Sequence, residues 1–281
     1  MRLGYSMSYW GGAGLGPADH LTLVHEAERL GYGSVWAAET YGTDPAALMA
    51  WIAGRTERIG LGTGVLQMSG RKPVVAAMTA ATIDLGKELS LGVFPVQARL
   101  PVYLAAMGPE TTALAGELAD GWLAIHFPPE HLAERTAQLR RGAERAGRSL
   151  DGFDVAPMVL TLVDEDEELA FDMMRPMLAL YLGGMGSRRT NFYNRLARSL
   201  GSGKEAEAVQ EAFLGGRQGE AMSLLPDALV DAMTMCGPAG KLRERVAAYR
   251  EAGATSLIVG LVTPTLRLRL EQLELVAELA A

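Results

Sequence analysis

Residues 34–73 decide the fold, and they read SVWAAETYGTDPAALMAWIAGRTERIGLGTGVLQMSGRKP. The apolar run Ser34–Ala38 predicts a strand that ends on a carboxylate, Glu39. A helix follows, beginning near Asp44-Pro45, a capping residue with a proline at the first helical position. A second strand, Ile59–Gly64, then runs into a glycine-rich turn. Alternation of strand, helix and strand predicts a parallel sheet, which carries its chemistry at the carboxyl ends of its strands.

The same alternation continues through the rest of the chain. Further strands are predicted at Arg2–Met7, Val102–Ala106, Gly121–Ile125, Val155–Leu162 and Ser256–Val259. Helices are predicted at Ala18–Leu30, Pro73–Leu85, Pro109–Leu118, Pro129–Ala146, Lys241–Ala252 and Leu266–Leu279. A long, glycine-interrupted helical region, Glu165–Val230, precedes the last strand. No Gly-x-Gly-x-x-Gly turn follows the first strand, which disfavours a dinucleotide-binding fold. We therefore predict one α/β domain over residues 1–281, a (β/α)8 TIM barrel with a helical insertion before its last strand.

The number of strands falls short of a closed barrel. The pattern gives about seven strands, and the shortfall lies at Leu85–Gly86. There a helix passes into GKELSLGVFPVQARLP with no strand–helix unit between. A barrel that lacks a strand exposes two unpaired sheet edges, which proteins avoid. We predict that a strand–helix–loop unit is missing between Leu85 and Gly86. A real deletion, with the barrel closed in another way, is the alternative.

Composition excludes several classes of protein. The net charge of −7 argues against a nucleic-acid platform, which needs a basic face. The single cysteine, Cys236, excludes a disulfide framework or a cysteine-based zinc site within one chain. The first residues lack the apolar core of a signal peptide, and no apolar run is long enough to span a membrane. The four histidines show no zinc-helix spacing, so no metal is implied. We expect a cytoplasmic protein that acts on a small molecule.

Three stretches resemble a known family. They are IGLGTGV at 59–65, VYLAAMGP at 102–109, and the block Phe213–Gly260. Together they resemble the luciferase-like monooxygenase superfamily, and within it the coenzyme F420-dependent oxidoreductases, a branch that includes methylene-tetrahydromethanopterin reductase. The resemblance implies that the deazaflavin F420 exchanges a hydride with a small organic substrate. It also implies a non-proline cis peptide at Gly64–Val65, where a bulge backs the cofactor ring. FMN is the alternative cofactor.

Candidate site residues lie at the predicted strand ends. Glu39 is the candidate catalytic residue, for orienting substrate or handling a proton; a solvated carboxylate or helix cap is the alternative. Pro109 begins a helix whose amino end could hold an anion, or it could belong to an ordinary loop. The resemblance implies cofactor contacts from Thr40, Thr63, Gly64, Val65, Met107, Gly108 and Pro109. Tyr41 and His126 are candidate substrate-binding residues.

One departure from the family pattern limits the choice of reaction. Several deazaflavin enzymes follow the acid at this strand end with a histidine, whereas this chain has Thr40. Threonine cannot act as a general base near neutral pH, which puts sugar-phosphate and alcohol oxidation in doubt. The rival interpretations are an FMN-dependent luciferase-like monooxygenase and a non-catalytic relative that only binds or dimerises.

The sequence also suggests how two copies could assemble and what two pairs of basic residues could do. The small residues in Ala46–Ala53 and Val74–Ala81 suit a homodimer formed through the second and third helices. The pairs Arg71-Lys72 and Arg188-Arg189 either meet the anionic tail of the cofactor or are solvated surface.

Overall fold

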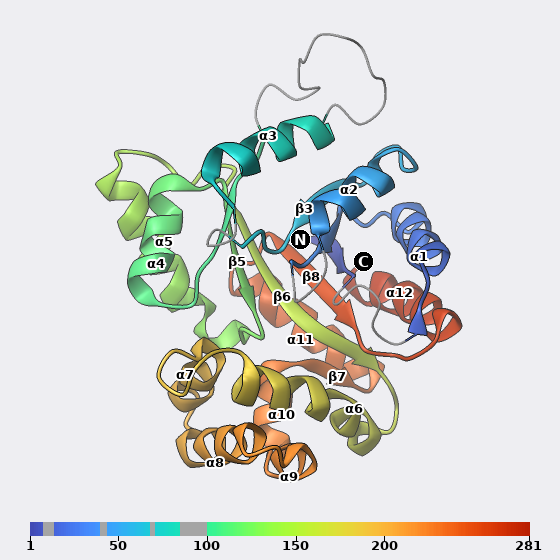
Figure 1. Cartoon of the computed structure of the whole chain (residues 1–281), viewed down its shortest axis with the longest axis vertical. Helices are drawn as coiled ribbons and strands as arrows, with labels where there is room; N and C mark the ends of the chain where they lie inside the picture. The colour runs from blue at the N-terminus through green and yellow to red at the C-terminus, as the bar shows by residue number, and fades with distance from the viewer. Residues whose placement is uncertain (8–13, 40–43, 68–70, 85–99) are drawn as a thin grey trace.

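The predicted barrel wall forms, with helices on its outer side (Figure 1). The computed structural model describes residues 1–7, 14–39, 44–67, 71–84 and 100–281. The strands of the wall are β1 (Arg2–Ser6), β2 (Ser34–Ala37), β3 (Gly60–Thr63), β4 (Tyr103–Ala105), β5 (Gly121–Ile125), β6 (Asp154–Val163) and β8 (Ser256–Leu261). The outer helices are α1 (Pro17–Arg29), α2 (Pro45–Ala53), α3 (Pro73–Asp84), α4 (Pro109–Leu118), α5 (Leu132–Arg145), α11 (Ala239–Glu251) and α12 (Leu266–Ala280).

The strands are parallel, and their order leaves the wall open at one place. The order is β3-β2-β1-β8-β6-β5-β4. Among the described residues, β3 therefore pairs only with β2, and β4 pairs only with β5. These two end strands flank Leu85–Gly86 in the sequence, a junction that lies outside the described residues. The order agrees with the expected shortfall of one strand, and the missing unit itself stays a prediction.

The helical insertion before the last strand is confirmed, and Figure 1 shows its helices gathered at one end of the molecule. It comprises α6 (Glu167–Ala179), the π-helical turn η3 (Leu180–Gly184), α7 (Phe192–Ser199), α8 (Gly203–Leu214), α9 (Gln218–Ser223) and α10 (Asp227–Met233). A short strand that the sequence did not predict, β7 (Met235–Gly237), follows it and pairs with β6. All three residues are buried, so the strand lacks the alternation of polar and apolar side chains by which a strand is recognised in a sequence.

Local signals placed most helix ends correctly. The Asp44 carboxylate accepts a hydrogen bond of 2.9 Å from the Ala46 N–H, so it caps α2 as predicted. The helix expected from Pro129 instead opens with a 3-10 turn, η2 (Pro129–His131), before α5 begins. Within the described ranges, no helix is long and apolar enough to cross a membrane.

Two aromatic rings fill the interior of the barrel. Trp36 of β2 and Tyr103 of β4 meet edge to face, with ring centroids 5.2 Å apart. A Cβ at Gly62 would lie 2.5 Å from the Trp36 ring, and one at Gly121 would overlap the Tyr103 ring. Glycine at these two strand positions therefore makes the room that the rings occupy. Side chains therefore pack the interior of the barrel between β2 and β4.

A buried carboxylate joins four strands at the amino end of the barrel. Asp154, the first residue of β6, accepts hydrogen bonds from the Tyr103 hydroxyl at 2.7 Å and the Ser256 hydroxyl at 2.8 Å. Oδ2, the oxygen that accepts from Tyr103, also lies 3.0 Å from Nη2 of Arg2. Arg2, Tyr103 and Ser256 begin β1, β4 and β8. One side chain thus ties together the starts of four strands, two of which are not its neighbours in the sheet.

Removing this carboxylate is expected to destabilise the barrel. Asp154→Ala leaves the Tyr103 and Ser256 hydroxyls without their acceptor, so the free energy of unfolding should fall by about 2–4 kcal/mol. Urea denaturation followed by circular dichroism measures the change. The control is Asp151→Ala, at an exposed position three residues earlier, which should cost less than about 0.5 kcal/mol. Equal losses in the two variants would contradict the role given to Asp154.

Candidate functional site

A hollow lies at the carboxyl ends of the barrel strands, where the sequence places the chemistry. It is lined by Ser6, Ala38, Gly64, Ile125, Met158, Leu160, Met177, Tyr181 and Gly260. Most of these residues come from the strands or follow them directly, and Met177 and Tyr181 come from the insertion. The hollow is narrow, with a volume of about 40 Å³. Its lining is mainly small or apolar and includes two hydroxyl-bearing side chains.

The bulge after β3 has the predicted backbone. The Gly64–Val65 peptide is cis, as the resemblance implied. The Gly64 N–H donates to the Ala37 carbonyl at 2.8 Å, and the Glu39 N–H donates to the Val65 carbonyl at 3.1 Å. These bonds join the segment after β3 to the end of β2. Gly64 lines the hollow, and Thr63 is the last residue of β3.

Glu39 lies at the predicted strand end, but its carboxylate is engaged by the protein. Oε2 accepts a hydrogen bond of 2.6 Å from the Gln67 N–H, and Oε1 lies 3.1 Å from Nη2 of Arg71. Both side chains of this ion pair are 18% exposed. Glu39 is not among the residues that line the hollow. Its contacts link the end of β2 to Gln67 and Arg71, so the carboxylate holds these residues in place.

Arg71 bridges two carboxylates, so it is not simply solvated surface; contact of this pair with the cofactor tail stays a prediction. The guanidinium contacts Glu39 and lies 2.8 Å from Oδ1 of Asp44, which also caps α2. The hydrogen bond to Glu39 is the main cause that raises the pKa of Arg71 above its ordinary value. The sequence missed this bridge because Arg71 lies about thirty residues beyond the two carboxylates and meets them only when the segments after β2 and β3 come together.

Two predicted residues cannot be placed, and three lie apart from the hollow. Thr40 and Tyr41 are outside the described residues. Met107, Gly108 and Pro109 form the turn from β4 into α4, and none of them lines the hollow. The Gly108 N–H donates to the hydroxyl of Thr111 at 3.3 Å, so this amide already has a partner. Contact of this turn with a cofactor stays a prediction.

His126 is not among the residues that line the hollow, and its contact with a substrate stays a prediction. Its side chain is fully buried, with Nδ1 3.2 Å from the Met233 carbonyl and Nε2 without a hydrogen-bond partner among the described residues. Ile125, the preceding residue, lines the hollow. The backbone of His126 has φ 58°, an uncommon value for a residue with a side chain.

The aromatic residue that reaches the hollow is Tyr181, against which His126 packs. Their ring centroids are 4.6 Å apart in an edge-to-face arrangement, and Tyr193 packs on Tyr181 at 4.7 Å. Sequence reasoning missed both Tyr181 and Met177. The insertion is recognisably helical, but its pattern does not reveal which turn returns to the barrel mouth. A signal was available in the sequence. Pro176 and the pair Gly183-Gly184, about two turns later, indicate that the helix becomes irregular here.

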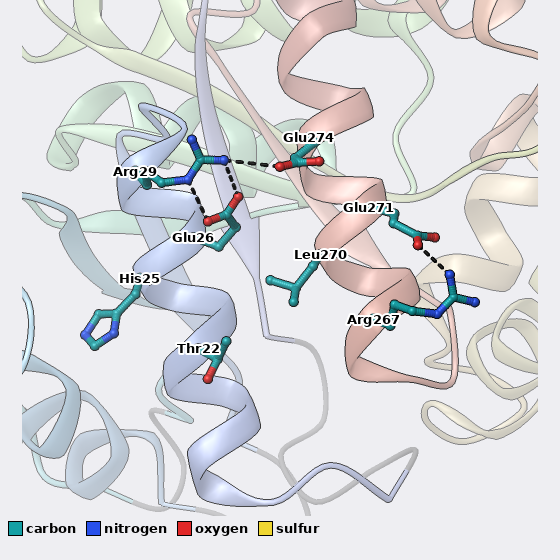
Figure 2. Close-up of a pocket in the computed structure, with 8 residues that line it drawn as sticks. All are labelled: Thr22, His25, Glu26, Arg29, Arg267, Leu270, Glu271 and Glu274. Carbon is teal, nitrogen blue, oxygen red and sulfur yellow. Dashed lines mark hydrogen bonds and ion pairs between the residues drawn. The ribbon is translucent and has the colours of Figure 1, made fainter.

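A larger hollow lies elsewhere and has a different character. Figure 2 shows it between α1 and α12, on the outer side of the barrel, with a volume of about 490 Å³. Arg29 is paired with Glu26 and Glu274, and Arg267 is paired with Glu271 (Figure 2). This groove is broad, is remote from the strand ends and has both arginines neutralised by carboxylates. We therefore place the functional site at the smaller hollow beside Gly64.

Comparison with known proteins shows the family of this chain. The sequence model of the family described as luciferase-like monooxygenase matches residues 1–92 and 85–256. A protein of Mycobacterium tuberculosis, described as a coenzyme F420-dependent oxidoreductase, is 30% identical over 330 residues, covering 92% of this chain and 94% of that protein. The 5,10-methylenetetrahydromethanopterin reductase of Methanopyrus kandleri is 26% identical over 223 residues, covering 77% of this chain and 62% of the reductase.

The solved structures agree with the fold. The coenzyme F420-dependent tetrahydromethanopterin reductase of Methanopyrus kandleri superimposes with a TM-score of 0.80 and 21% identity, over 99% of this chain and 97% of that chain. This likeness extends to the whole barrel and its insertion.

The buried His126 is expected to make stability depend on pH. Burial lowers its pKa in the folded protein to about 4, below the ordinary value of 6.5. The unfolded chain therefore takes up the proton first, and the free energy of unfolding should fall as the pH drops from about 6.5 towards about 4. Buried His20 acts in the same direction. His126→Asn accepts positive φ and does not titrate, so it should reduce this slope without abolishing it. Urea unfolding across this range measures the slope, and identical slopes would show that His126 does not contribute.

Proposed function

The chain belongs to the luciferase-like monooxygenase family, and on that premise we propose that it is an F420-dependent oxidoreductase that transfers a hydride between this deazaflavin and a small organic substrate. The observation that carries the proposal is the similarity, along 92% of this chain, to a protein described as a coenzyme F420-dependent oxidoreductase. The position of the hollow supports it, because barrel enzymes act at the carboxyl ends of their strands.

The residues at the strand ends fit a flat, uncharged ring. Ser6, Ala38, Gly64 and Gly260 leave the mouth of the barrel free of bulky side chains on four strands. The volume of about 40 Å³ is far below the roughly 300–1,000 Å³ of ordinary ligand pockets. The hollow by itself is therefore too small for a whole cofactor, and we take it as one part of the proposed site.

Bound F420 supplies or accepts the hydride, and the protein supplies binding and orientation. We assign Thr63, Gly64 and Val65 to contacts with the ring, and the turn at 107–109 to contacts with the anionic tail. Glu39 acts as a positioning residue, because its carboxylate holds Arg71 and the Gln67 N–H. Pairing of two copies through α2 and α3 stays a prediction, for which Val75 and Met78 offer exposed apolar side chains.

Cofactor titration tests the proposal. The purified protein is titrated with F420 and, separately, with FMN, and the fluorescence of each cofactor is recorded. We expect F420 fluorescence to be quenched to saturation and FMN fluorescence to change little. Gly64→Ala provides a local probe, because its Cβ would meet Met158 at 3.4 Å and Trp36 at 3.5 Å, which are ordinary contacts. This variant should fold yet bind F420 at least about ten-fold more weakly. Submicromolar FMN binding with no F420 binding would reverse the assignment.

A double-mutant cycle tests the role of Glu39. If Glu39 acts by holding Arg71, then Glu39→Gln and Arg71→Met should each weaken F420 binding by about ten-fold or less, and the double variant should lose no more than either. Arg71→Lys keeps the charge but loses the forked geometry of the guanidinium. Its affinity for F420 should therefore lie between those of the wild-type protein and Arg71→Met. Fluorescence titration gives the dissociation constants. Additive losses in the double variant would show that Glu39 acts independently of Arg71.

A further inference from the structure

One stretch of the insertion is rich in positive charge and contains no carboxylate. Between Asp172 and Glu205 the sequence has five arginines and one lysine, and it has no acidic residue. The whole chain, by contrast, has 33 acidic residues and 26 lysines and arginines. The charge of this stretch is therefore opposite to that of the chain, and it attracts negatively charged ligands to this part of the surface.

Three of these arginines form one exposed group, Arg188, Arg189 and Arg195, which we call the arginine patch. Nη1 of Arg195 donates to the Arg189 carbonyl at 3.2 Å, so this side chain of α7 lies beside the loop that precedes the helix. Its guanidinium also covers the exposed ring of Phe192, with Cζ 4.6 Å from the ring centroid. These two contacts orient the guanidinium and leave its charge without a counter-ion.

Within the part of the chain that the structure describes, no carboxylate lies within ion-pair distance of the arginine patch. Two other arginines of the same stretch do have acidic partners. Arg175 pairs with Asp172 and Asp227, and Arg198 lies 4.0 Å from Glu207. An arginine carries N–H donors in a planar fork that matches a carboxylate or a phosphate. The patch is therefore suited to an anionic ligand.

The patch is connected to the part of the insertion that reaches the barrel mouth. Nδ2 of Asn191 donates to the carbonyls of Tyr181 and Leu182, both at 2.9 Å. Asn191 is buried and also caps α7, the helix that carries part of the patch. Tyr181 in turn lines the small hollow beside Gly64, a recess at the carboxyl ends of the strands. One buried amide thus links the patch segment to the turn that lines the recess.

The recess and the patch offer different chemistry. The recess has no charged side chain in its lining, whereas the patch presents three exposed guanidinium groups. F420 has a matching division, because it joins a flat ring to a tail of phosphate and glutamates. An extended peptide spans roughly 3.3–3.6 Å per residue, so a tail of several glutamates reaches well beyond the ring.

We propose that the arginine patch binds the glutamate carboxylates of the F420 tail. This inference rests on the proposed function, because it concerns the same cofactor at the same site. The phosphate stays with the turn at 107–109, and the glutamates beyond it pair with Arg188, Arg189 and Arg195. The patch then contributes to cofactor affinity without contacting the ring.

Two forms of the cofactor serve as probes. One is F420 with several glutamates, and the other is the same deazaflavin with its phosphate but without the glutamates. They differ only in the groups that the patch is proposed to bind. Fluorescence titration gives the dissociation constant of each form, first at low ionic strength and then at about 1 M salt, where charges are screened beyond about 3 Å.

The variant that removes the patch carries Arg188→Gln, Arg189→Gln and Arg195→Gln together. The single variant Arg189→Gln is compared with Arg217→Gln, a matched control. Arg217 is an exposed arginine of the same insertion, but it is paired with Glu220 at 2.7 Å. Circular dichroism establishes that each variant folds, and the single variants decide the question if the triple variant does not.

At low ionic strength, the wild-type protein should bind the glutamate form about five-fold or more tightly than the form without glutamates. The triple variant should lose most of this preference and bind the shorter form as the wild-type protein does. Arg189→Gln should reduce the preference by about two-fold, and Arg217→Gln should leave it unchanged. At about 1 M salt the preference of the wild-type protein should largely disappear.

The outcomes separate this inference from the proposed function. Equal affinity of the wild-type protein for both forms, or a preference that persists in the triple variant, would show that the patch is solvated surface. Equal weakening of both forms in the triple variant would show that the arginines act on the phosphate. Each of these results overturns the inference and leaves the proposed function standing. Failure of both forms to bind the wild-type protein would overturn the proposed function itself.

Discussion

The contact between Trp36 and Tyr103 packs the interior of the barrel, and the rest of the candidate site is arranged around it. The two rings meet at 5.2 Å between β2 and β4, and they fit because Gly62 and Gly121 have no side chains. Below them, the Tyr103 hydroxyl is held by Asp154, which also ties the starts of β1 and β8. These contacts fill and join the amino-terminal half of the barrel, and the small hollow lies at the carboxyl ends of the strands.

The same ring contact connects the strands on the two sides of the gap between β3 and β4. β2 and β4 are distant in the strand order, because β4 is an end strand and β3, the other end, lies beside β2. The ring contact therefore spans the interior between the two sides of the opening. A continuous wall is not needed to hold these strands at a fixed distance, since Trp36, Tyr103 and Asp154 link them from inside. The strand ends around Gly64 are consequently positioned by side-chain packing as well as by sheet hydrogen bonds.

The features that depend on short stretches of sequence were predicted correctly. The strand–helix alternation, the cap at Asp44, the helical insertion and the cis peptide at Gly64–Val65 all depend on short stretches or on a family resemblance. The errors concern contacts between distant segments. The ion pair of Glu39 with Arg71 depends on two loops meeting, and the burial of His126 depends on where β5 ends. Tyr181 reaches the barrel mouth through an irregular turn whose support, Asn191, lies ten residues away.

The charged side chains near the bulge are paired with one another, and the recess beside it has no charged side chain in its lining. The strand-end carboxylate Glu39 and its neighbour Asp44 are both satisfied by Arg71, so the ionised groups nearest to the bulge stabilise the loops. The recess is left to small and apolar side chains. Hydride chemistry tolerates such a lining, because a bound redox cofactor supplies the electrons and the protein need only hold the partners in contact and exclude water. The recess draws its lining from the insertion, through Met177 and Tyr181, as well as from the barrel.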